Sequence, residues 1–324
     1  MLVSVTFVSA CSTNAGNVGS RPQPAASRPF VALPSPDGWL DHLNFYRAAA
    51  RLSPVTENAA WSDADRKHAT YIVKNDVLRH SEDPDNSCYT PEGQTAAQQS
   101  NLFHSSNRDD TDCGAIDTWM QSPFHAVGLL DPRLVQVGFG SFREARGNPR
   151  MGAALNVIAG LSSAVKAPYP VFWPGRDTII PLSLHSAGTP DPLASCPGYT
   201  APSGLPLILQ IGPGNLTPEV SATSFTQSGR PLEHCVFDET TYRNPDRQQQ
   251  QLGRGILGAR DAIVLIPRFP LTAGTTYTAS ITANGQTSTW SFEIGGAPPG
   301  RGRQNFSEIT KTGEGLMTAA CGQP

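Results

Sequence analysis

The 324-residue sequence carries little charge and no excess of positive charge. Charged residues make up 16% of it, and 24 Lys and Arg against 27 Asp and Glu give a formal net charge of −3. Nucleic-acid binding needs a concentrated basic surface, so this balance argues against a nucleic-acid partner. The sequence also lacks an apolar stretch long enough to span a bilayer, so no transmembrane helix is expected.

Glycine and proline are abundant, at 30 and 29 residues, and hydrophobic residues make up 38% of the chain. This composition is typical of turn-rich, partly all-β extracellular proteins rather than helical cytosolic enzymes. A chain of this length can bury one large core or two ordinary ones. We therefore expect an exported, turn-rich globular protein, and the helix and strand signals described below place it in the α+β class.

Residues 1–11 resemble an export signal. The run Leu2 to Ala10 is almost wholly apolar or small, and Val8 to Cys11 resembles a bacterial lipobox, in which cleavage precedes a cysteine that becomes lipidated. A complete signal has a positive first region, whereas the first basic residue is Arg21, so either the start lies upstream or the resemblance is accidental. On the first interpretation, Cys11 is the only membrane attachment, on the outer face of the cell envelope, and residues 12–34 form a flexible tether.

Residues 35–165 contain helix and strand signals with an ordered series of polar and aromatic residues between them. Ser35 with Pro36, Ser62 with Asp65, and Ser122 with Pro123 mark three helix starts, and the small apolar run Ala153 to Leu161 is typical of a central strand. The series consists of Asn44, Arg47, Trp61, His80, Ser100, Asn101, Trp119, Ser122, His125 and the run Gly138 to Gly140. Its order and spacing resemble the CAP family, also called SCP-like or cysteine-rich secretory, and the run from Ser122 to Pro132 resembles bacterial members.

The resemblance implies an α-β-α sandwich with a shallow cleft built around two histidines, here His80 and His125. Two residues far apart in the sequence that converge are stronger evidence of a site than one motif. The cleft would also be lined by Ser100, Asn101 and Ser122. The structural residues would be Asn44 and Arg47, which hydrogen-bond neighbouring loops behind the cleft, and Trp119, which lies in the core.

Both acidic positions of the family are changed. Members commonly carry Gly-Glu-Asn where this chain has Gln99, Ser100 and Asn101, and animal members carry a second acid where it has Gln121 and Ser122. Glutamate can act as a general base or a metal ligand, whereas serine without an activating base does neither well. A catalytic zinc site normally uses three protein ligands, and only the two histidines are in view.

Three functions are consistent with these residues. We favour a binding module that holds a lipid, a glycan or a protein at the cell surface. The first alternative is a peptidase-like hydrolase in which His80 and His125 hold zinc, the one cofactor considered, or act as acid and base, with Ser100 as a conceivable nucleophile. The second alternative is a structural surface protein with a vestigial cleft.

Residues 195–296 have an all-β pattern. Short apolar runs alternate with Gly, Pro and Asn turns, and the run Leu271 to Tyr277 resembles the tyrosine corner of immunoglobulin-like sandwiches, in which the Tyr277 hydroxyl bonds back to the upstream backbone. The resemblance implies a bacterial Ig-like module that serves mainly as a rigid spacer, after a linker at 166–194. Residues 244–251 are expected to form an exposed loop, and residues 297–324 a disordered tail.

The six cysteines divide by position. With Cys11 set aside, Cys88 and Cys113 fall in the first domain, Cys196 and Cys235 fall in the second, and Cys321 is left over. We expect one disulfide in each domain, which in an oxidising compartment would stabilise the fold by roughly 3 kcal/mol. Buried free thiols are the alternative, because sequence does not fix the pairing.

Overall fold

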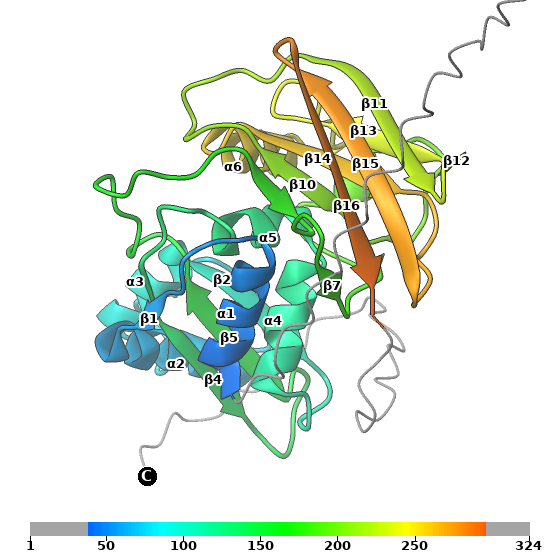
Figure 1. The fold of residues 1–324 in the computed structure, drawn as a ribbon. Helices are drawn as coiled ribbons and strands as arrows, with labels where there is room; N and C mark the ends of the chain where they lie inside the picture. The colour runs from blue at the N-terminus through cyan, green and yellow to red at the C-terminus, as the bar shows by residue number, and fades with distance from the viewer. Residues whose placement is uncertain (1–37, 296–324) are drawn as a thin grey trace, which may run out of the picture.

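A computed structural model of the chain describes residues 38–295 (Figure 1). It has a first part in which helices surround a small sheet and a second part built on two larger sheets. The helices are α1 Gly38–Ala49, α2 Ala59–Lys74, α3 Pro91–Gln99, α4 Asp112–Met120, α5 Pro123–Leu129 and α6 Arg247–Gly258. None of these described helices is long and apolar enough to cross a membrane.

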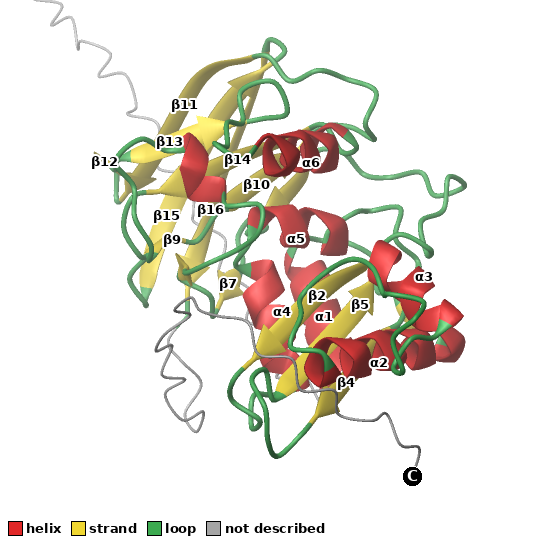
Figure 2. Cartoon of the chain, turned by 180° about the vertical axis from the view of Figure 1, so that it is seen from behind, coloured by secondary structure: helices red, strands yellow, loops and turns green. Residues whose placement is uncertain are grey.

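A three-stranded antiparallel sheet lies at the centre of the first part. Its order is β2 Ser100–Ser105, β5 Met151–Asn156 and β4 Phe139–Arg143, with helix α2 over one face and helices α1 and α4 over the other (Figure 2). Side-chain alternation along β4 produces these two layers: the Phe139 ring stacks on Trp39 of α1 at 5.1 Å, whereas Gly140 faces α2. A Cβ at Gly140 would overlap the backbone of Asp65 and Arg66, so glycine lets α2 lie directly against the sheet.

Helix α2 begins earlier than the sequence signal at Ser62 indicates. The side chain of Asn58 accepts hydrogen bonds from the backbone N–H groups of Ala60 and Trp61 and caps the helix. The Ser62 hydroxyl instead donates to Glu57 at 2.6 Å. Glu57 belongs to a two-residue strand, β1 Thr56–Glu57, which pairs in parallel with β3 Gln136–Val137.

The second part consists mainly of two sheets that face each other. The four-stranded sheet has the order β13–β14–β10–β6, and the five-stranded sheet has the order β12–β11–β15–β16–β7. The ring of Phe172 in β6 lies 5.1 Å from that of Trp290 in β16, so side chains of the two sheets meet in a common core. The strands are β6 Val171–Trp173, β7 Ile179–Ile180, β8 Leu184–His185, β9 Ser203–Gly204, β10 Leu207–Gln210, β11 Val220–Gln227, β12 Arg230–Pro231, β13 His234–Phe237, β14 Ala262–Pro267, β15 Thr275–Ala283 and β16 Gln286–Ile294.

Residues 166–194, expected to form a linker, contribute strands to both sheets. Strand β6 pairs with β10, and β7 pairs in parallel with β16. The ring of Trp173 in β6 also contacts Tyr46 of α1, with 5.5 Å between centroids. The linker prediction for residues 166–194 is therefore wrong, because this segment packs into the fold. The two parts of the chain share one hydrophobic core.

The exposed loop predicted at 244–251 is wrong from Arg247 onward, where helix α6 begins. Asp246 caps this helix by accepting hydrogen bonds from the N–H groups of Gln248 and Gln249. The glutamine run tolerates a helix because straight side chains lose little rotamer freedom there. Helices α5 and α6 cover the outer face of the four-stranded sheet (Figure 2), and the central strand β14 is buried along its whole length.

The disulfide predicted for the second part is confirmed, because Cys196 and Cys235 are joined. The expected bridge between Cys88 and Cys113 is not formed within residues 38–295. The turn of Cys88 leads into α3, which packs beside α2, whereas Cys113 lies on α4, on the other face of the sheet (Figure 2). Cys11 and Cys321 lie outside the described residues.

The hydroxyl of Tyr277 makes the backbone contact predicted for it. It accepts a hydrogen bond of 2.8 Å from the N–H group of Thr272, five residues upstream, and the side chain is buried. The bond ties the start of β15 to the loop that precedes it.

Candidate functional site

Loop 79–82, which carries His80, is held by a buried pair of side chains. His68 Nδ1 on α2 lies 2.9 Å from a Glu82 carboxylate oxygen, and both side chains are fully buried. His68 Nε2 donates to the carbonyl oxygen of Arg79 at 3.1 Å. Residues on both sides of His80 are therefore fixed to α2.

The imidazole of His80 is fixed by α3. Its Nδ1 donates a 2.7 Å hydrogen bond to the carbonyl oxygen of Ala97. Because a carbonyl only accepts, the proton of the neutral ring is on Nδ1, and Nε2 is left as an acceptor. The residue is partly exposed, but protein surrounds enough of the ring for desolvation to lower its pKa.

His125 lies in the first turn of α5. Ser122 occupies the cap position and Pro123 the first helical position, as the sequence predicts. The Ser122 hydroxyl makes no capping bond and lies 3.2 Å from His125 Nδ1. Burial first, and then the neighbouring His80 and His185, lower the pKa of His125 to about 4. The ring is therefore neutral at pH 7.

His80 and His125 act on each other despite their distance in the sequence. A positive charge on His80 would oppose protonation of His125, and this is one of the causes of the lowered pKa of His125, so the two rings lie in one region. Asn101 on β2 donates a 3.3 Å hydrogen bond to the carbonyl oxygen of His125 and is mostly buried, as is Ser122. We call His80, Asn101, Ser122 and His125 the histidine site.

Ser100 does not belong to the histidine site. Neighbouring strand residues point to opposite faces of a sheet, so Asn101 faces α5 and Ser100 faces α2. The Ser100 hydroxyl donates a 2.6 Å hydrogen bond to Asp65, and only 5% of Ser100 is exposed. A side chain so buried cannot act as a nucleophile on an external substrate.

A third histidine, His185, reaches the site from the second part of the chain. It is in β8, is 1% exposed, and its Nδ1 donates to the carbonyl oxygen of Gln121 at 2.9 Å. Gly188, three residues on, lies so close to Ser122 that a Cβ there would overlap its hydroxyl. Sequence reasoning missed His185 because it is a lone histidine, without a motif, in a segment interpreted as a linker.

The side chains do not fit a metal centre. Within residues 38–295, no three His, Cys, Asp or Glu side chains are arranged to hold a metal ion. Glu82 and Asp65, the buried carboxylates beside this region, are engaged by His68 and Ser100. His80 and His125 alone do not provide the three protein ligands that a catalytic zinc ion normally takes.

The three residues predicted to have structural roles in the first part of the chain are anchored to backbone groups. Asn44 forms a pair of hydrogen bonds with the backbone of Val55, at 3.0 and 2.8 Å. The buried guanidinium of Arg47 donates to four carbonyl oxygens, among them that of Leu129 at the end of α5. Trp119 donates from Nε1 to the carbonyl oxygen of Leu102 at 2.9 Å.

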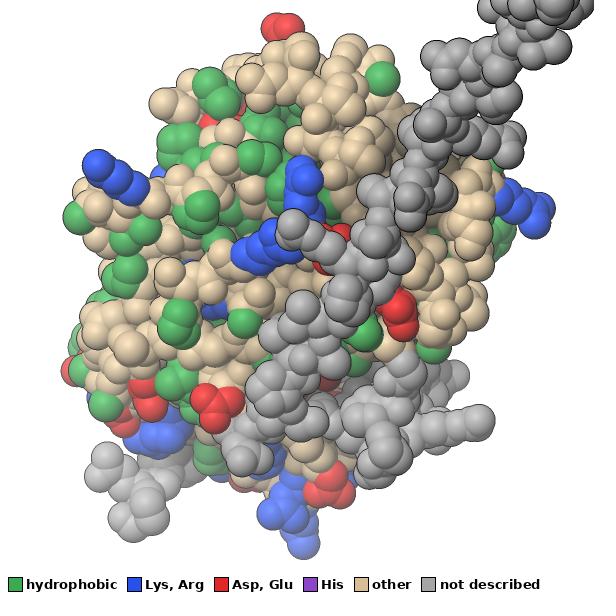
Figure 3. Space-filling model, viewed as in Figure 1, with side chains coloured by type: hydrophobic (Ala, Val, Ile, Leu, Met, Phe, Trp, Pro, Cys, Tyr) green, Lys and Arg blue, Asp and Glu red, His purple; other side chains and the backbone are tan. Residues whose placement is uncertain are grey.

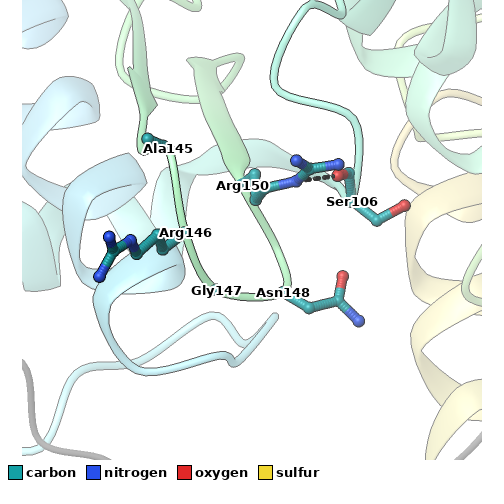
Figure 4. A pocket seen from close by; sticks show the side chains of 6 residues that line it. All are labelled: Ser106, Ala145, Arg146, Gly147, Asn148 and Arg150. Carbon is teal, nitrogen blue, oxygen red and sulfur yellow. Dashed lines mark hydrogen bonds between the residues drawn. The ribbon is translucent and has the colours of Figure 1, made fainter.

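Two surface pockets lie elsewhere in the first part. One, of about 330 Å³, is formed by the turn between β4 and β5, where Arg150 donates to the carbonyl oxygen of Ser106 at 2.6 Å and Arg146 points away (Figure 4). The other, of about 340 Å³, lies between the start of α2 and β4. No histidine lines either pocket. Basic side chains are scattered over the face shown in Figure 3.

Residues 40–149 match the model of the cysteine-rich secretory protein family, known as CAP. The match spans α1 to the turn before β5 and includes all four residues of the histidine site. No curated protein matches the chain. A mixed helix and strand structure over the matched residues agrees with this family, so this part of the chain is similar to a CAP domain.

Proposed function

We propose that the CAP domain is an extracellular binding module whose ligand contacts His80 and His125. The observation that carries this proposal is that two imidazoles from distant parts of the chain share one region, both with a lowered pKa and one of them partly exposed. A CAP domain is consistent with an extracellular ligand-binding role. The layered helices and sheet are, in this proposal, the α-β-α sandwich of that family.

The chemistry of the site favours an uncharged ligand that donates hydrogen bonds. Nε2 of His80 is an acceptor, because Nδ1 holds the proton. The charged groups that act on His80 and His125 are themselves histidines, and no carboxylate or basic side chain shifts their pKa values. Among lipid, glycan and protein, a glycan presents the most neutral hydroxyl donors. We therefore propose a neutral glycan as the first ligand class to test.

The hydrolase alternative has less support. Ser122 is close to His125 but is 1% exposed, and Ser100 faces α2. Acyl transfer needs an accessible nucleophile beside its base, and neither serine meets that condition.

We also propose that the protein is exported and acts on the outer face of the cell envelope, held there by lipidation of Cys11. The Cys196–Cys235 disulfide supports an oxidising compartment. The paired antiparallel sheets and the Tyr277 hydrogen bond support an Ig-like module for the second part. Helix α6 and the parallel pairing of β7 with β16 would be additions to that fold.

Binding of the full chain to neutral and anionic glycans and to lipid vesicles tests the proposed function. His80→Ala removes one neutral hydrogen-bond acceptor, worth about 1 kcal/mol, so affinity for a neutral glycan should fall several-fold. His104→Ala, at the far end of β2, is the control and should leave affinity unchanged. Binding that is equal in wild type, His80→Ala and His125→Ala would rule the histidine site out as the contact surface.

A further inference from the structure

Helix α5, which carries His125, contacts the second part of the chain along its whole length. At its start, His185 donates to the carbonyl oxygen of Gln121, and Gly188 lies against Ser122. These contacts come from the segment that begins at β8. They reach the turn from which His125 projects.

The first turn of α5 also packs against aromatic residues of the second part. The ring of Phe124, next to His125 in the sequence, lies 4.8 Å from Tyr242 and 6.2 Å from Phe237, between centroids. Gly253 of α6 completes this contact, because a Cβ there would overlap the Tyr242 ring and press on Phe124. Phe124 is 4% exposed, so the second part supplies its packing surface.

The end of α5 is held by polar contacts. The side-chain amide of Gln210, in β10, donates to the carbonyl oxygen of Leu130 at 3.0 Å. Arg260, after α6, lies 3.0 Å from the carboxylate of Asp131, and both side chains are buried. A buried ion pair of this kind fixes orientation because its geometry has to be maintained.

A helix of seven residues is too short to be stable by itself, so tertiary contacts must define where α5 lies. The contacts at its start and at its end both include the second part. We propose that the second part is a positioning element of the histidine site, and that His185 is a positioning residue that fixes the Gln121–Ser122 turn and thereby the His125 ring. His185 itself is too buried to touch a ligand. The inference rests on the proposed function for its purpose, but its test needs no ligand.

The test uses the full chain with ¹⁵N-labelled histidine, observed by NMR at pH 8, where the three rings are neutral. His185→Ala removes the bond to Gln121, so the ring nitrogen signals of His125 should move as its contact with Ser122 changes. His185→Asn keeps a donor near the position of Nδ1 and should restore them. The control is His234→Ala, which removes a second-part histidine that bonds to Thr223 and Leu232 and has no contact with α5.

Gly188→Ala gives an independent variant, since its methyl group should push the segment away from Ser122 and move the same His125 signals. Unchanged His125 signals in folded His185→Ala and Gly188→Ala would overturn the inference. If His185→Ala does not fold, His185→Asn becomes the test. His125 ring signals like those of wild type in His185→Asn support the inference, and displaced His125 signals contradict it. If neither glycans nor lipid vesicles bind the full chain but the ring signals move as expected, the proposed function is wrong and the positioning role of the second part stands.

Discussion

The hydroxyl of Ser100 on β2 donates a 2.6 Å hydrogen bond to the carboxyl group of Asp65 on α2, and both side chains are buried between helix and sheet. The second carboxyl oxygen of Asp65 has no hydrogen-bond partner. Burial raises the pKa of Asp65 from 3.8 to about 7, against the opposing effects of the Ser100 bond and of the nearby backbone N–H group of Asn156. A carboxyl group thus occupies the contact between α2 and the sheet, on the side away from the histidines.

Asp65→Asn should stabilise the protein at pH 8. The folded state holds the Asp65 proton more tightly than the unfolded state, so wild-type stability falls as pH rises from about 4 to 7 and the full cost is present above that. Asparagine does not ionise and keeps an acceptor for Ser100. The gain at pH 8 should reach up to about 4 kcal/mol and vanish near pH 4. Urea unfolding across this pH range measures it.

Asp63→Asn, two residues earlier on the same helix, is the matched control. Hydrogen bonds from Arg66 and Lys67 lower the pKa of this exposed carboxyl group, so it contributes stability that is lost as pH falls. The control should be slightly less stable than wild type at pH 8, by less than about 1 kcal/mol. If both variants changed stability in the same direction at pH 8, burial of Asp65 would not be the cause of its raised pKa.

His68→Ala should destabilise the fold strongly. It leaves the Glu82 carboxylate buried with its histidine partner removed, which typically costs about 3–5 kcal/mol. Because Arg79 also loses its contact with His68, loop 79–82 should show faster amide hydrogen exchange. Lys67→Ala removes only exposed ion pairs and should cost less than about 1 kcal/mol. Equal melting temperatures for the two variants would contradict a supporting role for the buried pair.

Loss of the Cys196–Cys235 disulfide should lower stability by about 4 kcal/mol, as expected for a bridge that spans 39 residues. The change is Cys196→Ser with Cys235→Ser, and the measurement is the free energy of unfolding in urea. If the double variant and the wild type unfolded at the same urea concentration, the disulfide would not contribute to the stability of the folded protein in solution.

The sequence predicted the first part of the fold better than the second. Apolar periodicity and the Ser122–Pro123 signal are local properties, and they located α1, α2 and α5 to within a few residues. Helix α6 was missed because its glutamine run was interpreted as low-complexity sequence, and because Gly253, Gly255 and Gly258 weaken the local helix signal. Strands β6 and β7 were missed because two or three residues carry too little pattern, and only their partners β10 and β16 define them.

The site shows a similar division. His80 and His125 could be placed by resemblance to a family, and Asn101 lies beside them. Ser100 was placed on the wrong face because strand alternation depends on a register that the sequence does not give. His185 could not have been found at all, since its role comes from a contact between two parts of the chain. Long-range contacts of this kind have no local signal.

Arg47→Lys should destabilise the protein although the charge is kept. The guanidinium is buried and donates to the carbonyl oxygens of Ser53, Leu129, Asp131 and Leu134, and although burial lowers its pKa to about 10 it stays protonated at pH 7. A lysine ammonium has three donors around one point and cannot match that planar arrangement. At least one buried carbonyl would lose its partner, at a cost of about 1–3 kcal/mol.

Arg51→Lys is the matched control for this change, because it lies one turn further along the chain, is exposed, and makes one ion pair with Asp177 at 3.5 Å. It should change stability by no more than about 0.5 kcal/mol. Thermal unfolding of the two variants side by side measures the difference. Since Arg47 holds the carbonyl of Leu129 at the end of α5, only Arg47→Lys should also move the His125 ring signals. A loss of stability without that movement would show that α5 is positioned by the second part of the chain alone.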